Sequence, residues 1–118
     1  MTTADFDFVQ TVLDDLASIG PIDQRPYFGG LALVCDGRQF AFIMGTTLYL
    51  ATNEHTRAAM RSSGSQPFEY RTRNGYRTVE AYYDTPQRVI DDRRLLVAWA
   101  TTALATRQAR VLSGSPGA

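Results

Sequence analysis

Residue types that commonly carry catalysis are scarce in this chain. It contains one cysteine, Cys35, and one histidine, His55. Together they fall short of a zinc ligand set unless carboxylates join them. Cys35 lies on a predicted strand, where a small apolar role is usual, and His55 lies in the first turn of a predicted helix, where the helix dipole disfavours its charged form. We therefore predict no catalytic residue, no metal and no cofactor.

The charged residues narrow the chemistry further. Twelve acidic residues balance twelve basic ones, and every basic residue is arginine. Without lysine the chain has no Schiff-base nucleophile and no P-loop of the Gly-Lys-Ser/Thr type. The adjacent acids at 14–15 and 91–92 point about 100° apart on a helix, so neither pair is a natural bidentate site. The charge balance argues mildly against nucleic acid as the main partner.

The most distinctive motif is Arg25-Pro26-Tyr27-Phe28-Gly29-Gly30. Gly29 and Gly30 could let backbone amides approach an anion. No helix start follows them, which weakens a phosphate-binding loop and favours a structural role, either a turn or the close approach of another backbone. In that role we predict that Phe28 is a core anchor and that Arg25 pairs with a carboxylate or a chain terminus.

A second group of candidates lies on a hairpin predicted over residues 67–83. One face of it combines cations with stacking surfaces, from Arg71, Arg73, Tyr76 and Tyr82. This mixture binds single-stranded nucleic acid, and it is equally typical of protein interfaces. Glu69 and Glu80 share the face and would repel phosphate. The face is therefore predicted to be a protein interface, with direct nucleic-acid binding and a plain solvated sheet face as the alternatives.

The elements that must position these residues follow an α+β pattern. Periodicity and turn residues predict a helix over 3–19 with Thr2 or Thr3 as its N-cap, strands over 31–35, 39–44 and 47–51, a helix over 54–62 with Asn53 as its N-cap, strands over 67–73 and 76–83, and a helix from 91 or 92. This α-β-β-β-α-β-β-α order predicts two layers, a largely antiparallel sheet of about five strands with helices packed against it. Residues 1–112 are expected to form one domain and 113–118 a flexible tail.

The pair Asp36-Gly37 predicts a hairpin with a two-residue type I′ turn. Such a loop pairs Leu33 with Phe40 and Leu31 with Phe42, and it places these four residues on one face. The opposite face is also apolar. Since the chain's helices can cover one face, we expect a second copy to cover the other, in a homodimer.

The pair Asn74-Gly75 predicts a second type I′ hairpin. Its register places Tyr70 opposite Val79 and Phe68 opposite Ala81, on the core face. The turn before residues 47–51 could have two or three residues, so the face occupied by Tyr49 stays open.

The sequence carries no targeting signal that we recognise. No apolar run approaches the roughly 20 residues that span a bilayer. The first ten residues lack the basic start and apolar run of a signal peptide, so we expect a cytoplasmic location.

One further set of residues joins the predicted elements in a distinctive order. The set comprises Arg25 to Gly30, Asp36-Gly37, Phe40-Ala41, Leu48-Tyr49-Leu50, Thr56-Arg57, the segment 64–70, Tyr82-Tyr83, Pro86 and Leu95-Leu96-x-x-Trp99. In these residues the chain resembles the N-terminal domain of the TfoX (Sxy) family, over roughly residues 5 to 107. It departs from the family at Tyr27, where Met is common, at Ala51, where a basic residue is common, and at Glu80-Ala81, where Met-Ser is common.

The resemblance implies the family's fold and a regulatory role. Longer members regulate natural competence through transcription, and many small bacterial proteins resemble the N-terminal domain alone. We therefore expect a non-enzymatic interaction or regulatory domain that binds a protein partner or itself. Its candidate motif and interface residues are Arg25, Phe28, Gly29, Gly30, Tyr49, Arg71, Arg73, Tyr76, Tyr82 and Tyr83. The alternatives are a direct nucleic-acid binder and a small-ligand domain whose pocket is lined by Tyr27, Tyr49 or His55.

Overall fold

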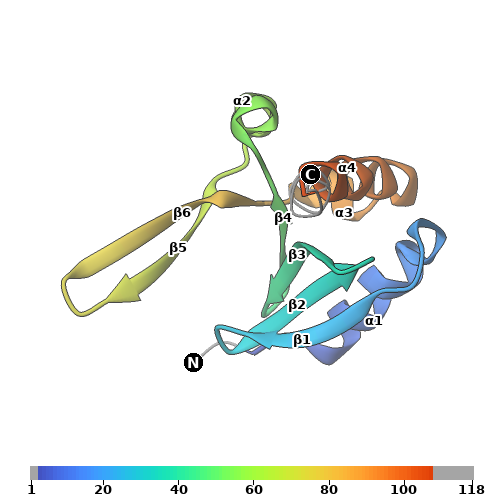
Figure 1. The fold of residues 1–118 in the computed structure, drawn as a ribbon, viewed down its shortest axis with the longest axis horizontal. Coiled ribbons are helices and arrows are strands. Elements are labelled where there is room, and N and C mark those ends of the chain that lie inside the picture. The colour runs from blue at the N-terminus through green and yellow to red at the C-terminus, as the bar shows by residue number, and fades with distance from the viewer. Residues whose placement is uncertain (1–2, 108–118) are drawn as a thin grey trace, which may run out of the picture.

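A computed structural model describes residues 3–107, so the predicted tail over 113–118 lies outside the described residues. The elements are α1 (Phe6–Asp15), the short 3-10 helix η1 (Ala17–Ile19), β1 (Asp23–Tyr27), β2 (Gly30–Cys35), β3 (Arg38–Met44), β4 (Thr47–Ala51), α2 (Glu54–Ser62), β5 (Pro67–Thr72), β6 (Gly75–Asp84), α3 (Gln87–Ile90) and α4 (Arg93–Ala105). The strands form one antiparallel sheet in the order β1-β2-β3-β4-β6-β5 (Figure 1). The predicted α+β class is confirmed, but the sheet has six strands, because β1 is a strand that the pattern did not predict.

Local capping decides where the helices begin. The Asp5 side chain accepts a hydrogen bond from the Phe8 N–H at 2.9 Å, so α1 starts later than predicted and is not capped by Thr2 or Thr3. At α2 the predicted cap, Asn53, is confirmed, and a reciprocal bond with Thr56 completes a capping box. Such caps satisfy backbone N–H groups that the first helical turn leaves without partners.

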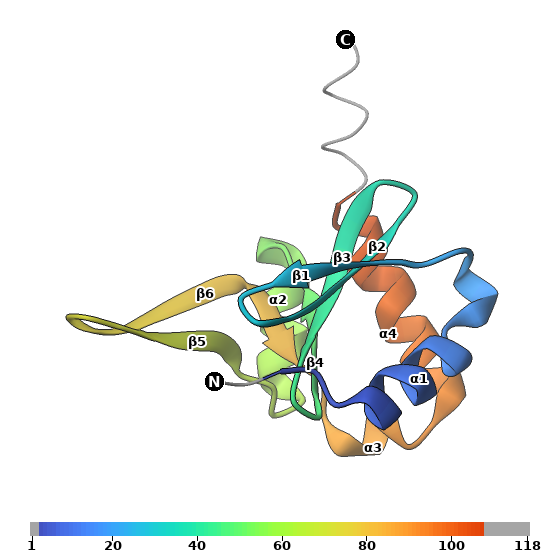
Figure 2. The same cartoon turned by 90° about the horizontal axis from the view of Figure 1, so that it is seen from below.

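The helices α1, α3 and α4 gather on one side of the sheet, as Figure 2 shows. Between α4 and the central strands lies an aliphatic core whose sheet residues are fully buried: Leu33, Ala41, Ile43, Leu48 and Leu50. From α4 the core receives Leu96, Ala100 and Ala103. Burial of these side chains provides the main stabilisation of the two layers.

The first predicted hairpin has the expected turn but a different register. Asp36 and Gly37 have φ of 58° and 76°, as a type I′ turn requires. A bulge between Leu33 and Val34 then shifts the pairing by one residue, so that Leu33 pairs with Ala41 instead of Phe40. A one-residue shift exchanges the faces of a strand. Phe42 therefore lies opposite Ala32, on the face away from the aliphatic core.

The second predicted hairpin has a different turn. Its central residues are Arg73 and Asn74, with Thr72 paired to Gly75, so the predicted type I′ turn at Asn74-Gly75 is wrong. The register differs from the prediction by two residues, and Phe68 faces Val79. A two-residue shift leaves each side chain on its predicted face, since side chains alternate with period two.

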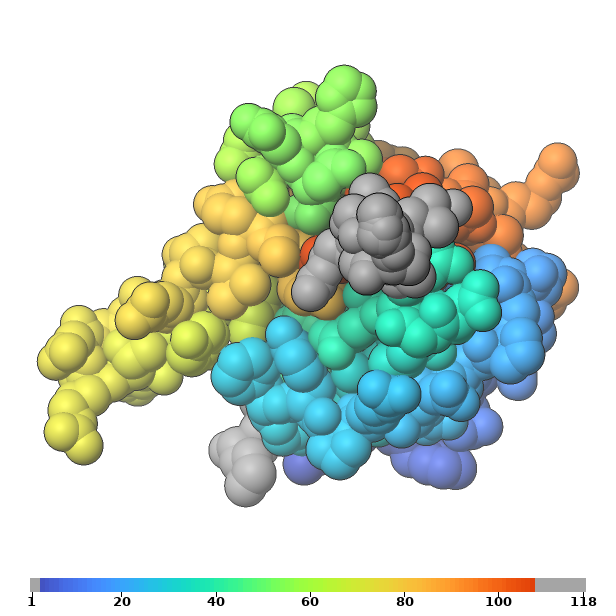
Figure 3. All heavy atoms as spheres, in the orientation of Figure 1, coloured from blue at the N-terminus to red at the C-terminus, as the bar shows by residue number. Residues whose placement is uncertain are grey.

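An arm formed by β5 and the outer part of β6, residues 67–79, projects from the body (Figures 1 and 3). The register jumps between Pro67, which pairs with Tyr83, and Phe68, which pairs with Val79. Three residues of β6, 80–82, thus have no partner on β5. The inner end of β6 pairs with β4 instead. The jump divides β6 into a root inside the body and an arm outside it.

Candidate functional site

An aromatic cluster covers the sheet face opposite the aliphatic core. Its rings come from the β1–β2 hairpin and from β3, β4, β5 and β6: Tyr27, Phe28, Phe42, Tyr49, Phe68, Tyr70 and Tyr82. The apolar pattern of the strands predicted that a second copy would cover one face of the sheet. The chain's own arm supplies part of that cover, because Phe68 on β5 lies against rings on β3 and β4.

The centre of the cluster is Phe42, which is completely buried. Its ring centroid lies 4.8 to 5.0 Å from those of Tyr27, Tyr49, Phe68 and Tyr82. The ring of Tyr49 stacks on that of Phe42, and those of Phe68 and Tyr82 meet it edge to face. Both arrangements suit the aromatic quadrupole. The bulge in β2–β3 is what turns Phe42 toward this face.

Two tyrosines of the cluster are partly shielded from water. Burial raises the pKa of the Tyr27 hydroxyl, and the nearby Tyr82 raises it further. Burial also raises the pKa of Tyr49, with a smaller contribution from the charge of Asp84. Both hydroxyls therefore stay protonated at neutral pH and can donate hydrogen bonds.

The rim of the cluster consists of Phe28, which is exposed, and Tyr70, which is half-buried. Phe28 is the first residue of the β1–β2 turn, with φ of 50°, and its ring is 57% exposed. It lies 5.2 Å from the ring of Tyr70 and 6.1 Å from that of Phe68. The prediction that Phe28 is a core anchor is wrong, because the turn holds this side chain at the edge of the cluster.

The two glycines of the motif have the structural roles that the sequence favoured. Gly29 has φ of 82° as the second residue of the turn. At Gly30 a Cβ atom would lie 2.3 Å from the Ile43 carbonyl oxygen, so only glycine lets β2 approach β3 there. Arg25, on β1, makes no ion pair among the residues that the structure describes, so the predicted pairing with a carboxylate is not formed there.

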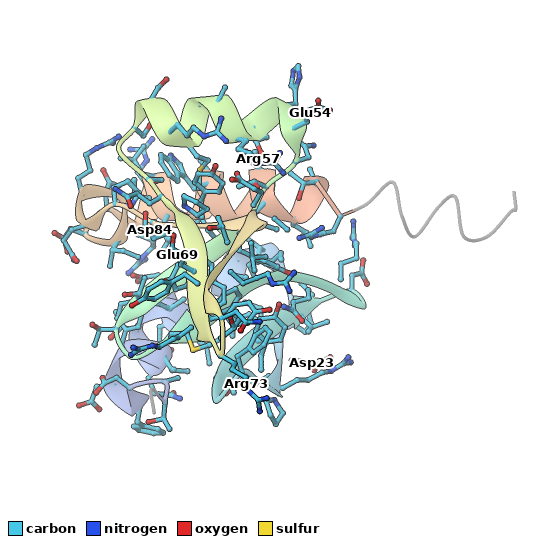
Figure 4. All side chains as sticks on the ribbon, turned by 90° about the vertical axis from the view of Figure 1, so that its left-hand side faces the viewer. Asp23, Glu54, Arg57, Glu69, Arg73 and Asp84 are labelled. Atoms are coloured by element: carbon cyan, nitrogen blue, oxygen red, sulfur yellow. The ribbon has the colours of Figure 1, made fainter. Side chains whose placement is uncertain are left out.

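The arm carries most of the predicted Arg–Tyr face. Arg71, Arg73 and Tyr76 are exposed on it, and Tyr76 is 69% exposed. In Figure 4, which looks toward the tip of the arm, Glu69 lies along β5 and Arg73 at the turn. The prediction that Tyr82 lies on this face is wrong. Tyr82 lies beyond the register jump, is buried in the aromatic cluster, and its ring lies under the Arg107 guanidinium at 5.0 Å.

Glu80 joins the root of the arm to α2 through a side chain that stays 47% exposed. Its carboxylate accepts a 2.6 Å hydrogen bond from the Tyr83 hydroxyl and pairs with Arg61 at 3.2 Å and Arg57 at 3.7 Å. Its backbone carbonyl accepts bonds from Thr52 and Arg57. The bond from Tyr83 is the main cause that lowers the pKa of Glu80, while burial raises that of Tyr83. Tyr83 is thus a buried structural residue on the helix side of the sheet.

The remaining chemical candidates lie apart from the cluster. Cys35 is buried, with its thiol 3.8 Å from the Ile19 carbonyl oxygen. His55 lines an apolar pocket of about 370 Å³ between α2 and α4, together with Leu50, Met60 and Trp99. The other two residues offered as the lining of a ligand pocket, Tyr27 and Tyr49, belong to the aromatic cluster.

Residues 3–107 contain neither a metal-ligand cluster nor a helix that could span a membrane. No three His, Cys, Asp or Glu side chains in that range lie together as a metal site would require. None of its helices combines the length and apolar character needed to cross a membrane.

Four rings of the cluster were absent from the predicted site: Tyr27, Phe42, Phe68 and Tyr70. The alternation of Phe68 and Tyr70 on one strand did predict a shared core face. What the sequence did not contain was a local signal for the bulge and the register jump that bring these rings to Phe28, Tyr49 and Tyr82.

The family model of the TfoX N-terminal domain matches residues 14–106, which is most of the chain. No curated protein matches the chain.

Proposed function

The chain belongs to the TfoX N-terminal domain family, and we propose that it acts as a non-enzymatic regulatory module that binds a protein partner through the rim of its aromatic cluster. Family membership supports a regulatory, competence-related domain at the level of the family. The partner, and any role in transcription, belong to the proposal.

The observation that carries the proposal is the conformation of Phe28. A bulky residue at φ of 50° is disfavoured, and the first position of a type I′ turn prefers Asn or Gly. Its ring is also 57% exposed, so burial offsets little of that cost. Strain of this kind is concentrated at functional sites. An exposed aromatic ring on a tight turn, supported from behind by Tyr70, is suited to enter a pocket on a partner.

Two side chains with nucleophilic or acid–base potential have structural roles that favour binding over catalysis. Cys35 is buried beside η1, and the carboxylate of Glu80 is engaged by Tyr83 and two arginines. Binding would draw on the aromatic rim and the neighbouring arginines of the arm.

A capture experiment tests the proposal. Tagged wild-type protein, Phe28→Asn and Phe6→Ala would be used to capture proteins from nuclease-treated host lysate. Asn suits the turn, so Phe28→Asn should fold while losing the ring. Phe6 is 72% exposed on α1, away from the cluster, and serves as the matched control. We expect a specific protein that wild type and Phe6→Ala retain and Phe28→Asn loses. Capture that does not depend on Phe28 would overturn the proposal.

Direct nucleic-acid binding remains a second candidate because of the charge on the arm. Arg71, Arg73 and Arg77 are exposed there, and no ion pair in residues 3–107 neutralises them. Glu80, which was expected to repel phosphate from this face, is turned toward α2. This candidate predicts salt-sensitive binding of single-stranded DNA that weakens in Arg71→Ala/Arg73→Ala. Arg93→Ala is the control, since Arg93 pairs with Asp15 at 3.4 Å on the body.

A further inference from the structure

The two edges of the sheet differ in their capacity to pair with another strand. At one edge, Tyr27 and Gly30 flank the two-residue turn of the β1–β2 hairpin. Residues that flank such a turn bond to each other, and the bonding then alternates along the strand. The outward backbone groups of β1 are therefore those of Gln24 and Pro26. Proline has no N–H to donate, so this edge is blunted.

The other edge, β5, is open. Thr72 and Gly75 flank the turn of the arm, and Tyr70 pairs with Arg77 two positions further on. The same alternation leaves the N–H and C=O groups of Glu69 and Arg71 pointing away from β6. In residues 3–107 no strand pairs with this side of β5, which is the last strand of the sheet. The outer part of the arm projects beyond the body in Figure 3.

The open edge is complementary to itself. If two β5 strands pair antiparallel about a twofold axis through Tyr70, Glu69 of each copy lies directly opposite Arg71 of the other. These are the two residues whose backbone groups point outward, so each such pair would exchange both of its hydrogen bonds. Their side chains share one face, and opposite charges placed directly across strands attract. The register is thus set by backbone and charge together.

The same register joins the two aromatic clusters. Tyr70 lies on the axis, on the face that carries Phe68 and the exposed ring of Phe28. The side chains of Tyr70 from two copies would meet in a non-hydrogen-bonded pair, where side chains approach most closely. One chain leaves Phe28 exposed and Tyr70 half-buried, and a second copy supplies further aromatic surface beside them.

We propose that two copies of this chain associate through antiparallel pairing of their β5 edges, centred on Tyr70, with Glu69 of each copy opposite Arg71 of the other. The inference rests on the proposed binding role of the aromatic rim and deepens it, because it names a second copy as one partner. An isologous contact of this kind closes as a dimer with twofold symmetry.

The test uses charge reversal on the full chain, followed by sedimentation over a series of protein concentrations. Glu69→Arg places Arg opposite Arg, and Arg71→Glu places Glu opposite Glu. Each single variant should weaken the dimer on the order of ten-fold, since both symmetric pairs are lost. The double variant Glu69→Arg/Arg71→Glu should restore the wild-type dissociation constant. An equimolar mixture of the two single variants should form a heterodimer, because each charge then meets its opposite.

Several results would overturn this proposal. They are a wild-type chain that stays monomeric at the highest concentration, a dimer unaffected by the single variants, and single variants that are not rescued by mixing. Circular dichroism and thermal unfolding show whether each variant folds, and restored pairing in the mixture cannot come from a folding defect. If the single charge variants are monomeric and still capture the protein whose capture depends on Phe28, the proposed function stands. A wild-type chain that sediments as a dimer then supports the β5 pairing, and a monomeric wild-type chain overturns it. A reversible dimer without any Phe28-dependent capture would support this inference and overturn the separate protein partner.

Discussion

The centre and the rim of the aromatic cluster are built from the same kinds of residue, yet they differ in burial and in backbone conformation. At the centre, Phe42 is fully buried among four neighbouring rings. At the rim, Phe28 has a disfavoured backbone conformation and a ring that is more than half exposed. The centre has a sufficient explanation in stability. The rim does not, and this difference directs the search for function to the rim.

The largest effect should follow from removing the ring at the centre. Phe42→Ala deletes a fully buried side chain that contacts rings on four strands. We expect it to lower the free energy of unfolding by about 3–5 kcal/mol, the usual cost of such a cavity. Urea denaturation measures the change. Phe6→Ala, at an exposed position on α1, should stay within about 0.5 kcal/mol of wild type. A small loss in Phe42→Ala would mean that the centre is not the core of this face.

A smaller loss of stability should follow from forcing the β1–β2 hairpin, which carries Phe28, away from β3. In Gly30→Ala the new Cβ would lie 2.3 Å from the Ile43 carbonyl oxygen and 2.7 Å from the Met44 sulfur. The β1–β2 hairpin must then move, at an expected cost of about 1–3 kcal/mol. Thermal unfolding measures it.

Gly64→Ala separates steric contact from backbone strain. Gly64 has φ of 91° but open space around it, so this control should lose only about 1 kcal/mol, from backbone strain. An equal or smaller loss in Gly30→Ala would show that the hairpin is not held by close approach.

The root of the arm provides a test that depends on pH. Tyr83→Phe removes the hydroxyl that donates to Glu80 and should cost about 1 kcal/mol at neutral pH. Because this bond lowers the pKa of Glu80, wild type holds the stabilisation above the ordinary value of 4.5 and loses it as the pH falls through the lowered value. The variant should therefore lose less stability than wild type on acidification.

The stability of the chain at alkaline pH gives an independent check of Tyr83. The pKa of Tyr83 is raised above 10.0, so its contribution is complete below that pH and is lost as the pH rises through the raised value. Tyr83→Phe should remove this part of the alkaline loss. Urea titrations at acidic, neutral and alkaline pH measure both limbs, and parallel curves for the two proteins would contradict the assignment.

Local signals in the sequence predicted local structure well. The turn at Asp36-Gly37 and the cap at Asn53 depend on residues within a few positions of one another, and both are confirmed. The strand β1 was missed because its residues, Asp23 to Tyr27, include a proline and show no apolar alternation, and the first four of them are exposed. It pairs with β2 in spite of its polar composition because a two-residue turn places the two strands side by side.

The candidate site was less predictable, because non-local pairing builds it. One bulge at Leu33 and one register jump at Pro67 decide which rings meet, and neither leaves a mark in the neighbouring residues. The jump takes Tyr82 from the predicted Arg–Tyr face into the cluster and turns Glu80 toward α2. Phe28 was noticed through its motif, but its exposure follows from the turn and not from its hydrophobicity.

The smallest change in stability should come from the rim, in Phe28→Asn. Relief of the turn strain and loss of the ring contact with Tyr70 are each worth about 1 kcal/mol and have opposite signs. We expect a net change of under about 0.5 kcal/mol by urea denaturation. Phe28→Ala loses the same ring without gaining the turn preference of Asn, so it should be less stable than Phe28→Asn. If Phe28→Asn instead destabilised the chain as much as Phe42→Ala, the ring would be an ordinary core residue. The exposed position of Phe28 would then require no partner, and the proposed function would lose the observation on which it depends.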